Sequence, residues 1–486
     1  MTLKNISIAY NKHYIDGQWM DGGKGERKII NPATEEELCS VPEGSKEEAE
    51  KAAQTAYRTF SSKEWKKLDG TARSRLLWKL AELIERDSKE IAALETMNMG
   101  KPIFESLHID VPFGANLFRY YAGLADKMKG AVLPTMKGFF TYTVKEPVGV
   151  SAMLVPWNFP FLLTCWKLAP ALASGCTAVI KPSPFTPLTA LKLAALVEEA
   201  GFPKGSVQVV LGDSEVGQAL IESPWVHKIS FTGSTRVGKM ILSQIGQNPL
   251  KRVTLELGGK SPNIIFGDCD LKRASQGACG GIFYNKGEIC SAGSRLLVEK
   301  SIEKPFLEAL QKAMGRYQMG DPFEESTRFG PQATKEHQER VLAYIQKGIQ
   351  EGAHLLTGGK ATKINGKGYF VEPTIFTQVT PEMTIAQEEI FGPVLSVIPF
   401  ETEEEALEIA NNNPYGLAAG LFTRDFGRIQ RFAQKLRCGT LWVNTYNMYH
   451  PSAPFGGVKE SGFGRELGEE GLEEFLETKT IWISEK

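Results

Sequence analysis

The sequence predicts an α/β protein with two doubly wound domains, and three observations lead to this prediction. Short apolar runs alternate with segments of helical periodicity between residues 150 and 256. A second alternation of the same kind extends from residue 262 to residue 443. Gly258 and Gly259 stand between the two alternations. Alternating strands and helices favour a parallel sheet covered on both faces, so each alternation predicts one domain.

The N-terminal region is expected to hold short strands followed by helices. Residues 14–19 and 31–34 indicate strands and turns, and Ser45 precedes a charged stretch as a helix N-cap does. Apolar residues at helical spacing predict one helix from Arg73 to Leu94 and a further helix from Pro102 to Lys127.

Each of the two alternations contains five predicted strands with helices between them. The first predicts strands at 151–155, 177–180, 207–211, 228–231 and 252–255, with helices at 189–200, 215–222 and 235–245. The second predicts strands at 262–266, 296–298, 394–399, 417–421 and 440–443, with helices at 270–283, 302–319, 338–351 and 403–411.

Two segments far apart in the chain indicate exposed strands. Residues 141–146 alternate between polar and apolar types, and residues 478–484 have similar strand character. Exposed strand edges tend to be covered by another chain, so we expect a homo-oligomer.

The composition indicates a globular protein whose partner is a small molecule. Hydrophobic residues make up 42% and charged residues 23% of the chain, close to average usage. A net charge of −1 and a pI near 6.7 lack the basic surplus that nucleic acids and anionic membranes require. An uncharged stretch at 149–166 contains two prolines, so we expect a strand, loop and helix there and no membrane span.

The cysteines indicate a reducing compartment. The seven of them are scattered and form no Cys-x-x-Cys pair, so we expect reduced thiols in the cytoplasm. The first ten residues lack the apolar core of a secretory signal, and export is not expected. The six histidines are isolated, and no metal site is predicted.

Cys290 is the candidate nucleophile. It lies between Gly287 and Gly293, and small residues follow it. Small neighbours leave the sulfur open to a carbonyl carbon and let backbone N–H groups approach the oxygen that becomes charged. The alternative is an inert buried thiol, because free cysteine is among the most buried residue types.

Glu256 is the candidate general base. It ends an apolar run between Leu255 and Leu257, just before two glycines. Burial there would raise the pKa of the carboxyl toward the working pH, as general-base catalysis prefers. The alternative is a carboxylate at a strand end that faces solvent.

Five motifs together resemble the NAD(P)-dependent aldehyde dehydrogenase superfamily. They are residues 156–160, 231–235, 255–262, 285–295 and 389–393, in the family's order. The resemblance covers nearly the whole chain. It implies a Rossmann-like cofactor domain (1–128 and 147–258), a catalytic domain (259–458) and oligomerisation segments (129–146 and 474–486) that assemble a dimer or tetramer.

The resemblance also implies how aldehydes would become carboxylic acids. The Cys290 thiolate attacks the aldehyde, and the Asn158 side-chain amide and the Cys290 N–H hold the oxyanion. Hydride leaves for the nicotinamide, and Glu256 activates the water that hydrolyses the thioester. Lys167 and Glu466 are implied as proton relays, with a surface position as the alternative for each. For Asn158 the alternative is a turn residue between two prolines.

The loop from Gly233 to Gly238 is the candidate phosphate site, although no Gly-x-Gly-x-x-Gly fingerprint is present. It lies between an apolar strand and a helix, where N–H groups and the helix dipole can hold a phosphate. Residues 233–239 also match the P-loop of a nucleotide hydrolase. Met240 stands where that loop needs a hydroxyl for magnesium, so the hydrolase is a weak alternative.

Further cofactor residues are implied by the resemblance. Ser234 contacts the pyrophosphate, Lys181 and Ser183 contact the adenosine ribose, and Glu389 holds the nicotinamide ribose. The other implied cofactor residues are Val155, Pro156, Trp157, Pro184, Gly212, Gly217, Phe231, Gly233, Val237, Leu257, Gly258 and Phe391. Pro184 replaces a glutamate by which NAD-specific members grip the ribose, so we expect NAD or NADP as cofactor.

Phe159, Trp166 and Phe455 match positions that line the substrate tunnel of the family. Betaine-aldehyde enzymes cage a trimethylammonium group by cation–π attraction, often with Tyr and Trp where this chain has Phe159 and Phe455. The weaker cage favours broad aliphatic and aromatic aldehydes over betaine aldehyde. Core packing is the alternative for the three aromatics.

Two further functions are weaker alternatives, because Cys290 and Glu256 are both present. One is an enzyme that forms acyl-coenzyme A, and the other is a non-catalytic binding or structural relative.

Overall fold

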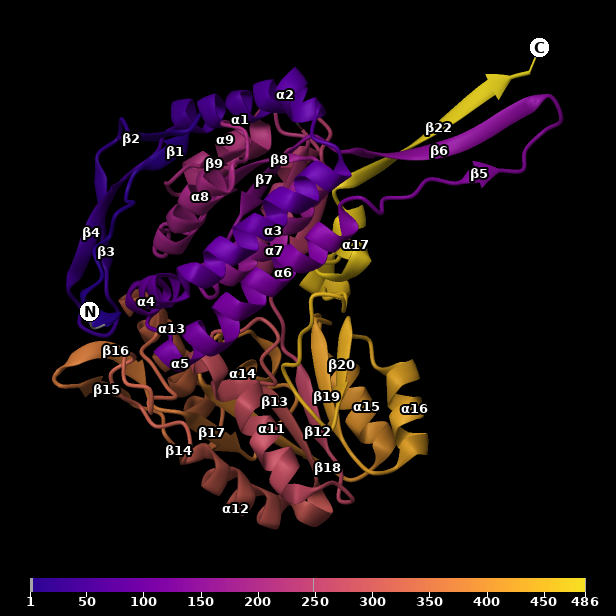
Figure 1. Cartoon of the computed structure of the whole chain (residues 1–486). Helices are drawn as coiled ribbons and strands as arrows, with labels where there is room; N and C mark the ends of the chain where they lie inside the picture. The colour runs from indigo at the N-terminus through magenta and orange to yellow at the C-terminus, as the bar shows by residue number, and fades with distance from the viewer. Residues whose placement is uncertain (1–2, 248, 486) are drawn as a thin grey trace.

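Two α/β bodies and a protruding arm make up the protein (Figure 1). The computed structural model describes residues 3–247 and 249–485. The indigo and magenta body holds the first sheet, the orange and pink body holds the second, and strands β5, β6 and β22 form the arm. This is the predicted α/β class with two parallel sheets.

The first sheet has the strand order β2-β1-β9-β8-β7-β10-β11-β21. Its order reverses between β7 and β10, which makes a topological switch point at the carboxyl ends of these strands. The parallel strands are β7 (Val150–Leu154), β8 (Thr177–Lys181), β9 (Val207–Val209), β10 (Lys228–Thr232) and β11 (Arg252–Glu256). The antiparallel additions are β1 (His13–Ile15), β2 (Gln18–Met20) and β21 (Gly462–Phe463).

Both faces of this sheet are covered by helices. On β7, Met153 packs into one hydrophobic core, whereas Ala152 and Leu154 pack into another. The predicted N-cap is confirmed, since Ser45 and Glu48 form a capping box. The helices of this body include α1 (Lys46–Ser61), α2 (Lys63–Lys66), α7 (Pro160–Ser174), α8 (Leu188–Ala200), α9 (Ser214–Glu222) and α10 (Thr235–Ile245).

Two predicted N-terminal helices are interrupted. The helix expected from Arg73 to Leu94 is in fact α3 (Gly70–Arg86) and α4 (Ser88–Met99), which part at Asp87, where the backbone is not helical (φ −95°, ψ 15°). The helix expected from Pro102 to Lys127 consists of α5 (Ile103–Glu105), a π-helical turn (Ser106–Asp110) and α6 (Val111–Leu124). Pro112 lacks the N–H that would donate to His108, so the wider π-turn is accommodated there.

The second sheet has the order β14-β17-β18-β13-β12-β19-β20. Leu296 on β13 packs into one core and Leu297 into another, so this sheet is also covered on both faces. Its strands are β12 (Pro262–Ile265), β13 (Arg295–Glu299), β17 (Thr374–Thr377), β18 (Val394–Phe400), β19 (Ala418–Phe422), β20 (Thr440–Val443) and the antiparallel edge strand β14 (His354–Thr357). Its helices include α11 (Leu271–Phe283), α12 (Glu303–Met314), α13 (Lys335–Gln350), α14 (Thr384–Gln387), α15 (Glu403–Asn411) and α16 (Phe426–Lys435).

Some parts of the second body differ from the prediction. Helix α12 ends at Met314, short of the expected residue 319, and β14, β17 and α16 were not predicted. Within α16 only Phe432 is buried, although Phe426, Ile429 and Phe432 recur at helical spacing, so the sequence carries a helical pattern that the prediction did not use. Two antiparallel two-stranded sheets lie outside the large sheets. One pairs β3 (Glu26–Ile30) with β4 (Glu37–Pro42), and the other pairs β15 (Ala361–Ile364) with β16 (Lys367–Val371).

The arm pairs the two segments that were predicted to be exposed strands. Strand β22 (Leu476–Ser484) runs antiparallel to β6 (Phe139–Pro147), and β5 (Val132–Leu133) pairs with the other edge of β6. Between the second body and β22, the chain returns to the first body, where β21 pairs with β11 and α17 (Gly468–Glu473) packs against α7. No helix in residues 3–247 and 249–485 is long and apolar enough to cross a membrane.

Candidate active site

A cavity of about 470 Å³ lies where the two bodies meet. Its walls come from α7, α11, the ends of β10 and β11, and the loop that follows β20. All the predicted catalytic and substrate residues except Lys167 line this cavity, namely Asn158, Phe159, Trp166, Glu256, Cys290, Phe455 and Glu466. The fold therefore gathers side chains that are up to about three hundred residues apart, as expected where loops from several elements meet.

A tight turn carries Cys290. Asn285, Lys286 and Gly287 all have positive φ (43°, 60° and 81°), and this turns the chain sharply after α11. Buried side chains fix the turn: Lys286 donates to the carbonyl of Met99 at 2.8 Å and pairs with Glu288 at 2.7 Å. Strain at such positions persists only where the surroundings hold it, so the nucleophile has a rigid mount.

The thiol of Cys290 is not activated by its surroundings in this state. Burial raises its pKa, and the negative charges of Glu389 and Glu256 raise it further. The backbone of Ser291 opposes this rise. Formation of the thiolate therefore needs a base or a bound positive charge nearby.

Asn158 is placed to serve an oxyanion. Its side-chain nitrogen donates one hydrogen to the carbonyl of Glu288 at 3.0 Å, and Asn285 donates to the carbonyl of Asn158 at 2.8 Å. The amide group has two hydrogens, so one remains for the cavity that Asn158 shares with Cys290. A role for Asn158 as a turn residue alone does not explain why its side-chain amide is buried and oriented in this way.

Glu256 ends β11 and is 5% exposed. Within the described part of the chain, neither carboxyl oxygen has a hydrogen-bond partner. Burial raises the pKa of this carboxyl well above its usual value, and the charge of Glu466 raises it further. The solvent-facing alternative is wrong, and a buried carboxyl whose pKa is raised in this way is a stronger proton acceptor than an exposed one once it is ionised.

Lys167 and Glu466 form a buried ion pair, so the surface alternative is wrong for both. Lys167 also donates to the hydroxyl of Thr232 at 2.7 Å. Glu466 and Thr232 line the cavity, and the charge of Lys167 lowers the pKa of Glu256. A chain of polar groups thus connects the cavity to the interior of the first body.

Aromatic rings surround the cavity near Cys290. The ring centroids of Trp166 and Phe455 are 5.7 Å apart, and Tyr449 lies 5.9 Å from Trp166 and 5.3 Å from Phe455. The hydroxyl of Tyr449 bonds that of Ser291 at 2.7 Å. Tyr449 was missed in the sequence, because a tyrosine in a polar loop gives no sign that the loop folds over the nucleophile.

The predicted cofactor residues gather at the switch point of the first sheet. Ser234 caps α10 and accepts from the N–H of Val237 at 3.4 Å, so the helix N-terminus faces the carboxyl ends of the strands. Segments 155–157, 181–184, 231–234 and 257–258 lie at or just after the carboxyl ends of β7, β8, β10 and β11. Gly212 follows β9 with φ 137°, and Gly217 in α9 leaves space beside Lys181.

Glu389 and Phe391 come from the second body. Oε1 of Glu389 accepts from the N–H of Gly259 at 3.0 Å, and burial raises the pKa of Glu389 to about 7. The Trp157 and Phe391 rings meet edge to face at 5.3 Å, and His337 bonds the carbonyl of Phe391 at 2.7 Å. This set offers a carboxylate for hydroxyl groups and an aromatic contact, which suits a dinucleotide across the crevice.

Lys181 and Pro184 stand at the other end of this crevice. Burial lowers the pKa of Lys181 to about 8, and its ammonium donates to the carbonyl of Pro182 at 3.1 Å. Ser183, Pro184 and Arg27 line one small cavity there. Pro184 itself therefore places no carboxylate here, and the nearby Arg27 guanidinium is paired with Glu43, which lines the same cavity.

The P-loop alternative fails on geometry. The ammonium of Lys239 pairs with Glu460 at 2.5 Å and the side chain is 64% exposed, so it does not face the Gly233 loop as a phosphate-binding lysine would. Met240 is also exposed.

The comparison with known sequences decides the family. The sequence model of the aldehyde dehydrogenase family matches residues 19–481. This chain belongs to that family. Retinal dehydrogenase 2 of Homo sapiens is 45% identical to this aldehyde dehydrogenase over 482 residues, which are 99% of this chain and 93% of the relative.

Solved structures agree with this family and fold. An indole-3-acetaldehyde dehydrogenase in complex with NAD+ has a TM-score of 0.97 and 41% identity, covering 99% of this chain and 98% of that one. A betaine aldehyde dehydrogenase variant of Staphylococcus aureus in complex with NAD+ has a TM-score of 0.95 and 43% identity, covering 98% of each chain. The predicted enzyme class, an oxidoreductase that acts on aldehydes, and the predicted NAD or NADP cofactor are confirmed at this level.

Proposed function

We propose that this aldehyde dehydrogenase oxidises aldehydes to carboxylates through a thioester on Cys290. The overall reaction consumes an aldehyde, water and oxidised NAD(P), and yields the carboxylic acid, reduced NAD(P) and one proton. One observation carries this proposal: Cys290, Asn158 and Glu256 line a single cavity beside the switch point. The bound nicotinamide would supply the hydride acceptor.

Each residue has a part that follows from its place. The Cys290 sulfur bonds the aldehyde carbon, and the free Asn158 hydrogen and the Cys290 N–H stabilise the resulting oxyanion. Once hydride has left, the thioester remains on Cys290. Glu256 takes a proton from water, hydroxide attacks the thioester, and the thiolate leaves. Lys167 and Glu466 pass that proton onward through their buried pair.

The cofactor residues fit either NAD or NADP. Ser234 and the α10 N-terminus would hold the pyrophosphate, Lys181 and Ser183 the adenosine ribose, and Glu389 the nicotinamide ribose. Pro184 presents no negative charge to a 2′-phosphate. We infer that both cofactors support turnover.

Broad aliphatic and aromatic aldehydes remain the proposed substrates. The rings of Trp166, Tyr449 and Phe455 form an apolar box, and Phe159 adds a further wall. Betaine aldehyde is the second candidate, because the Tyr449 ring adds an aromatic face to the box, and a relative named betaine aldehyde dehydrogenase shares this fold.

The test is the formation of reduced nicotinamide, followed by its absorbance, with NAD or NADP and a panel of aldehydes that includes betaine aldehyde. We expect turnover by the wild type and none by Cys290→Ala. Cys438→Ala is the matched control, since Cys438 lies outside the cavity. Equal rates for the wild type and Cys290→Ala would overturn the mechanism.

We also propose a homo-oligomer, dimer or tetramer, built through the arm (129–146 and 474–486), with residues 1–128 and 147–258 as the cofactor domain and 259–458 as the catalytic domain. Phe140, Trp482 and Ile483 are 46%, 51% and 47% exposed on the arm, an apolar area that a second copy would cover. Light scattering measures the molar mass of the Trp482→Glu variant and of the wild type, and an equal mass for the two would count against this proposal.

The seven free cysteines support a cytoplasmic location.

A further inference from the structure

The cavity continues outward beyond the aromatic rings into a more polar space, here called the outer chamber. Its wall is made by Arg273, Gln276 and Gly280 of α11, by Tyr317 after α12, and by Asn444 and Asn447 after β20. The inner part near Cys290 is aromatic. The rings of Phe422 and Tyr446 also lie beside α11, so the outer chamber has both aromatic and polar groups in its lining.

One face of α11 forms the floor of the outer chamber. Residues 273, 276 and 280 share a helix face, and Arg273 lies about 10 Å along the axis from Gly280. Gly280 adds no side chain to this floor, and a Cβ there would meet nothing closer than the Tyr317 hydroxyl at 3.5 Å. The path from Cys290 toward Arg273 is thus open at Gly280.

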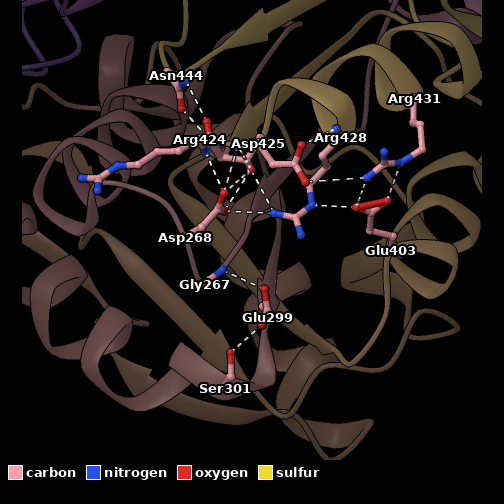
Figure 2. A network of polar contacts seen from close by, with 11 residues as sticks. Gly267, Asp268, Glu299, Ser301, Glu403, Arg424, Asp425, Arg428, Arg431 and Asn444 are labelled. Atoms are coloured by element: carbon pink, nitrogen blue, oxygen red, sulfur yellow. Dashed lines mark hydrogen bonds and ion pairs between the residues drawn. The ribbon is translucent and has the colours of Figure 1, made fainter.

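The opposite wall is fixed by a hydrogen-bond network (Figure 2). The Asn444 side chain accepts from the N–H of Thr423 at 3.1 Å and donates to its carbonyl at 3.0 Å. The Thr423 hydroxyl donates to Asp268, which also accepts from Arg428 at 3.0 Å. These two bonds to Thr423 fix the orientation of the Asn444 amide in the wall.

Arg273 is the positively charged group among the lining residues that the structure describes. Asp110 pairs with buried Lys101, Glu466 pairs with Lys167, and Glu256 is the proposed base. Arg273 is exposed, and its guanidinium makes no ion pair or hydrogen bond with residues 3–247 or 249–485. An arginine fork with all its donors free, at the end of an apolar tunnel, suits a carboxylate.

We propose that the outer chamber binds the carboxylate of a long ω-carboxy aldehyde, with Arg273 as the specificity-determining residue. This rests on the proposed function, since the aldehyde end must reach Cys290. The alkyl body lies between the aromatic rings and passes Gly280, and the tail carboxylate accepts from the guanidinium. The product is then the corresponding dicarboxylic acid.

The test compares matched substrates that differ only in the tail. The long pair is the semialdehyde of dodecanedioic acid and dodecanal; the short pair is the semialdehyde of adipic acid and hexanal. For each pair the ratio of kcat/KM, acid over neutral, is measured in the wild type, Arg273→Gln and Lys272→Gln. Lys272 is an exposed neighbour outside the lining and serves as the control.

We expect the long-pair ratio to fall roughly tenfold in Arg273→Gln, through KM rather than kcat, because a charged hydrogen bond is lost at a partly exposed site. The ratio should stay unchanged in Lys272→Gln, and the wild-type ratio should fall as salt rises. An unchanged long-pair ratio in Arg273→Gln overturns the proposal. An equal fall in the short pair also overturns it, because a short tail cannot reach Arg273 and the effect would be long-range attraction.

A second variant tests the path itself. Gly280→Leu should lower the ratio of kcat/KM for dodecanal over hexanal, because the side chain would stand in the passage. If this ratio does not change, the long chain does not pass Gly280 and the proposal fails. Turnover of hexanal by the wild type reports on the proposed function separately, so failure of the chamber and failure of the enzyme are distinguishable.

Discussion

Gly258 and Glu389 approach so closely that position 258 has no room for a side chain. A Cβ there would lie 2.3 Å from Oε2 of Glu389. We expect Gly258→Ala to displace this carboxylate and to weaken NAD(P) binding by roughly tenfold, the cost of a charged hydrogen bond. Tryptophan fluorescence quenching by the cofactor measures it. Gly246→Ala is the control, because a Cβ there meets nothing closer than 3.5 Å. Unchanged binding by Gly258→Ala would contradict the assignment.

Cofactor binding should depend on pH through Glu389. Burial raises its pKa to about 7, so the carboxylate is ionised above that pH and protonated below it. A protonated carboxyl loses acceptor capacity for ribose hydroxyls, and we expect the KM for NAD to rise as pH falls through about 7. Glu389→Gln should have a weaker affinity without this dependence. If Glu389→Gln keeps the wild-type dependence of the KM for NAD on pH, then Glu389 is not the group that causes this dependence.

Glu256→Gln should separate the two halves of the reaction. Acylation of Cys290 can proceed, but hydrolysis of the thioester lacks its base, so we expect one rapid burst of reduced nicotinamide per site and then a slow rate. Stopped-flow absorbance measures the burst. In the wild type the raised pKa of Glu256 implies that steady turnover falls as pH is lowered. Glu460→Gln, at the surface, is the control; steady turnover by Glu256→Gln at the wild-type rate would remove Glu256 from the mechanism.

Removing one member of the Lys167–Glu466 pair should destabilise the fold. Lys167→Met leaves the Glu466 carboxylate buried without its partner, at a cost of about 3–5 kcal/mol in the free energy of unfolding. The double variant Lys167→Met/Glu466→Leu should recover part of that loss. Urea unfolding measures both. If Lys167→Met/Glu466→Leu is as unstable as Lys167→Met, the loss in the free energy of unfolding does not come from the unpaired Glu466 carboxylate.

Pro184→Glu should shift cofactor choice toward NAD. The new carboxylate would repel the 2′-phosphate of NADP and could bond the ribose hydroxyls of NAD, so the KM for NADP should rise by about tenfold or more relative to that for NAD. Steady-state kinetics with both cofactors gives the ratio. Phe185→Glu, at an exposed neighbour, serves as control. An unchanged ratio would mean that this position does not face the ribose.

The strands and the chemistry could be predicted from the sequence where a local pattern is strong. Strand β20 has the predicted bounds because its apolar run is flanked by turn residues, and the assignment of Cys290 and Glu256 to one cavity follows from their motifs. The place of Tyr449 could not be predicted, because it depends on tertiary contacts that local periodicity does not carry, whereas the apolar residues of α16 recur at helical spacing and were open to prediction. The break at Asp87 likewise reflects a helix end with no glycine or proline to mark it.

The pairing of β21 with β11 has a consequence for synthesis of the chain. The last two residues of β11, Leu255 and Glu256, stay unpaired on this edge until Gly462 and Phe463 have left the ribosome. The nascent first body thus waits, with an unpaired edge, for the whole second body to be translated. Premature termination after Cys290 and before Gly462 would release chains that contain the nucleophile and expose this strand edge, so we expect chaperones to bind nascent chains most in that interval.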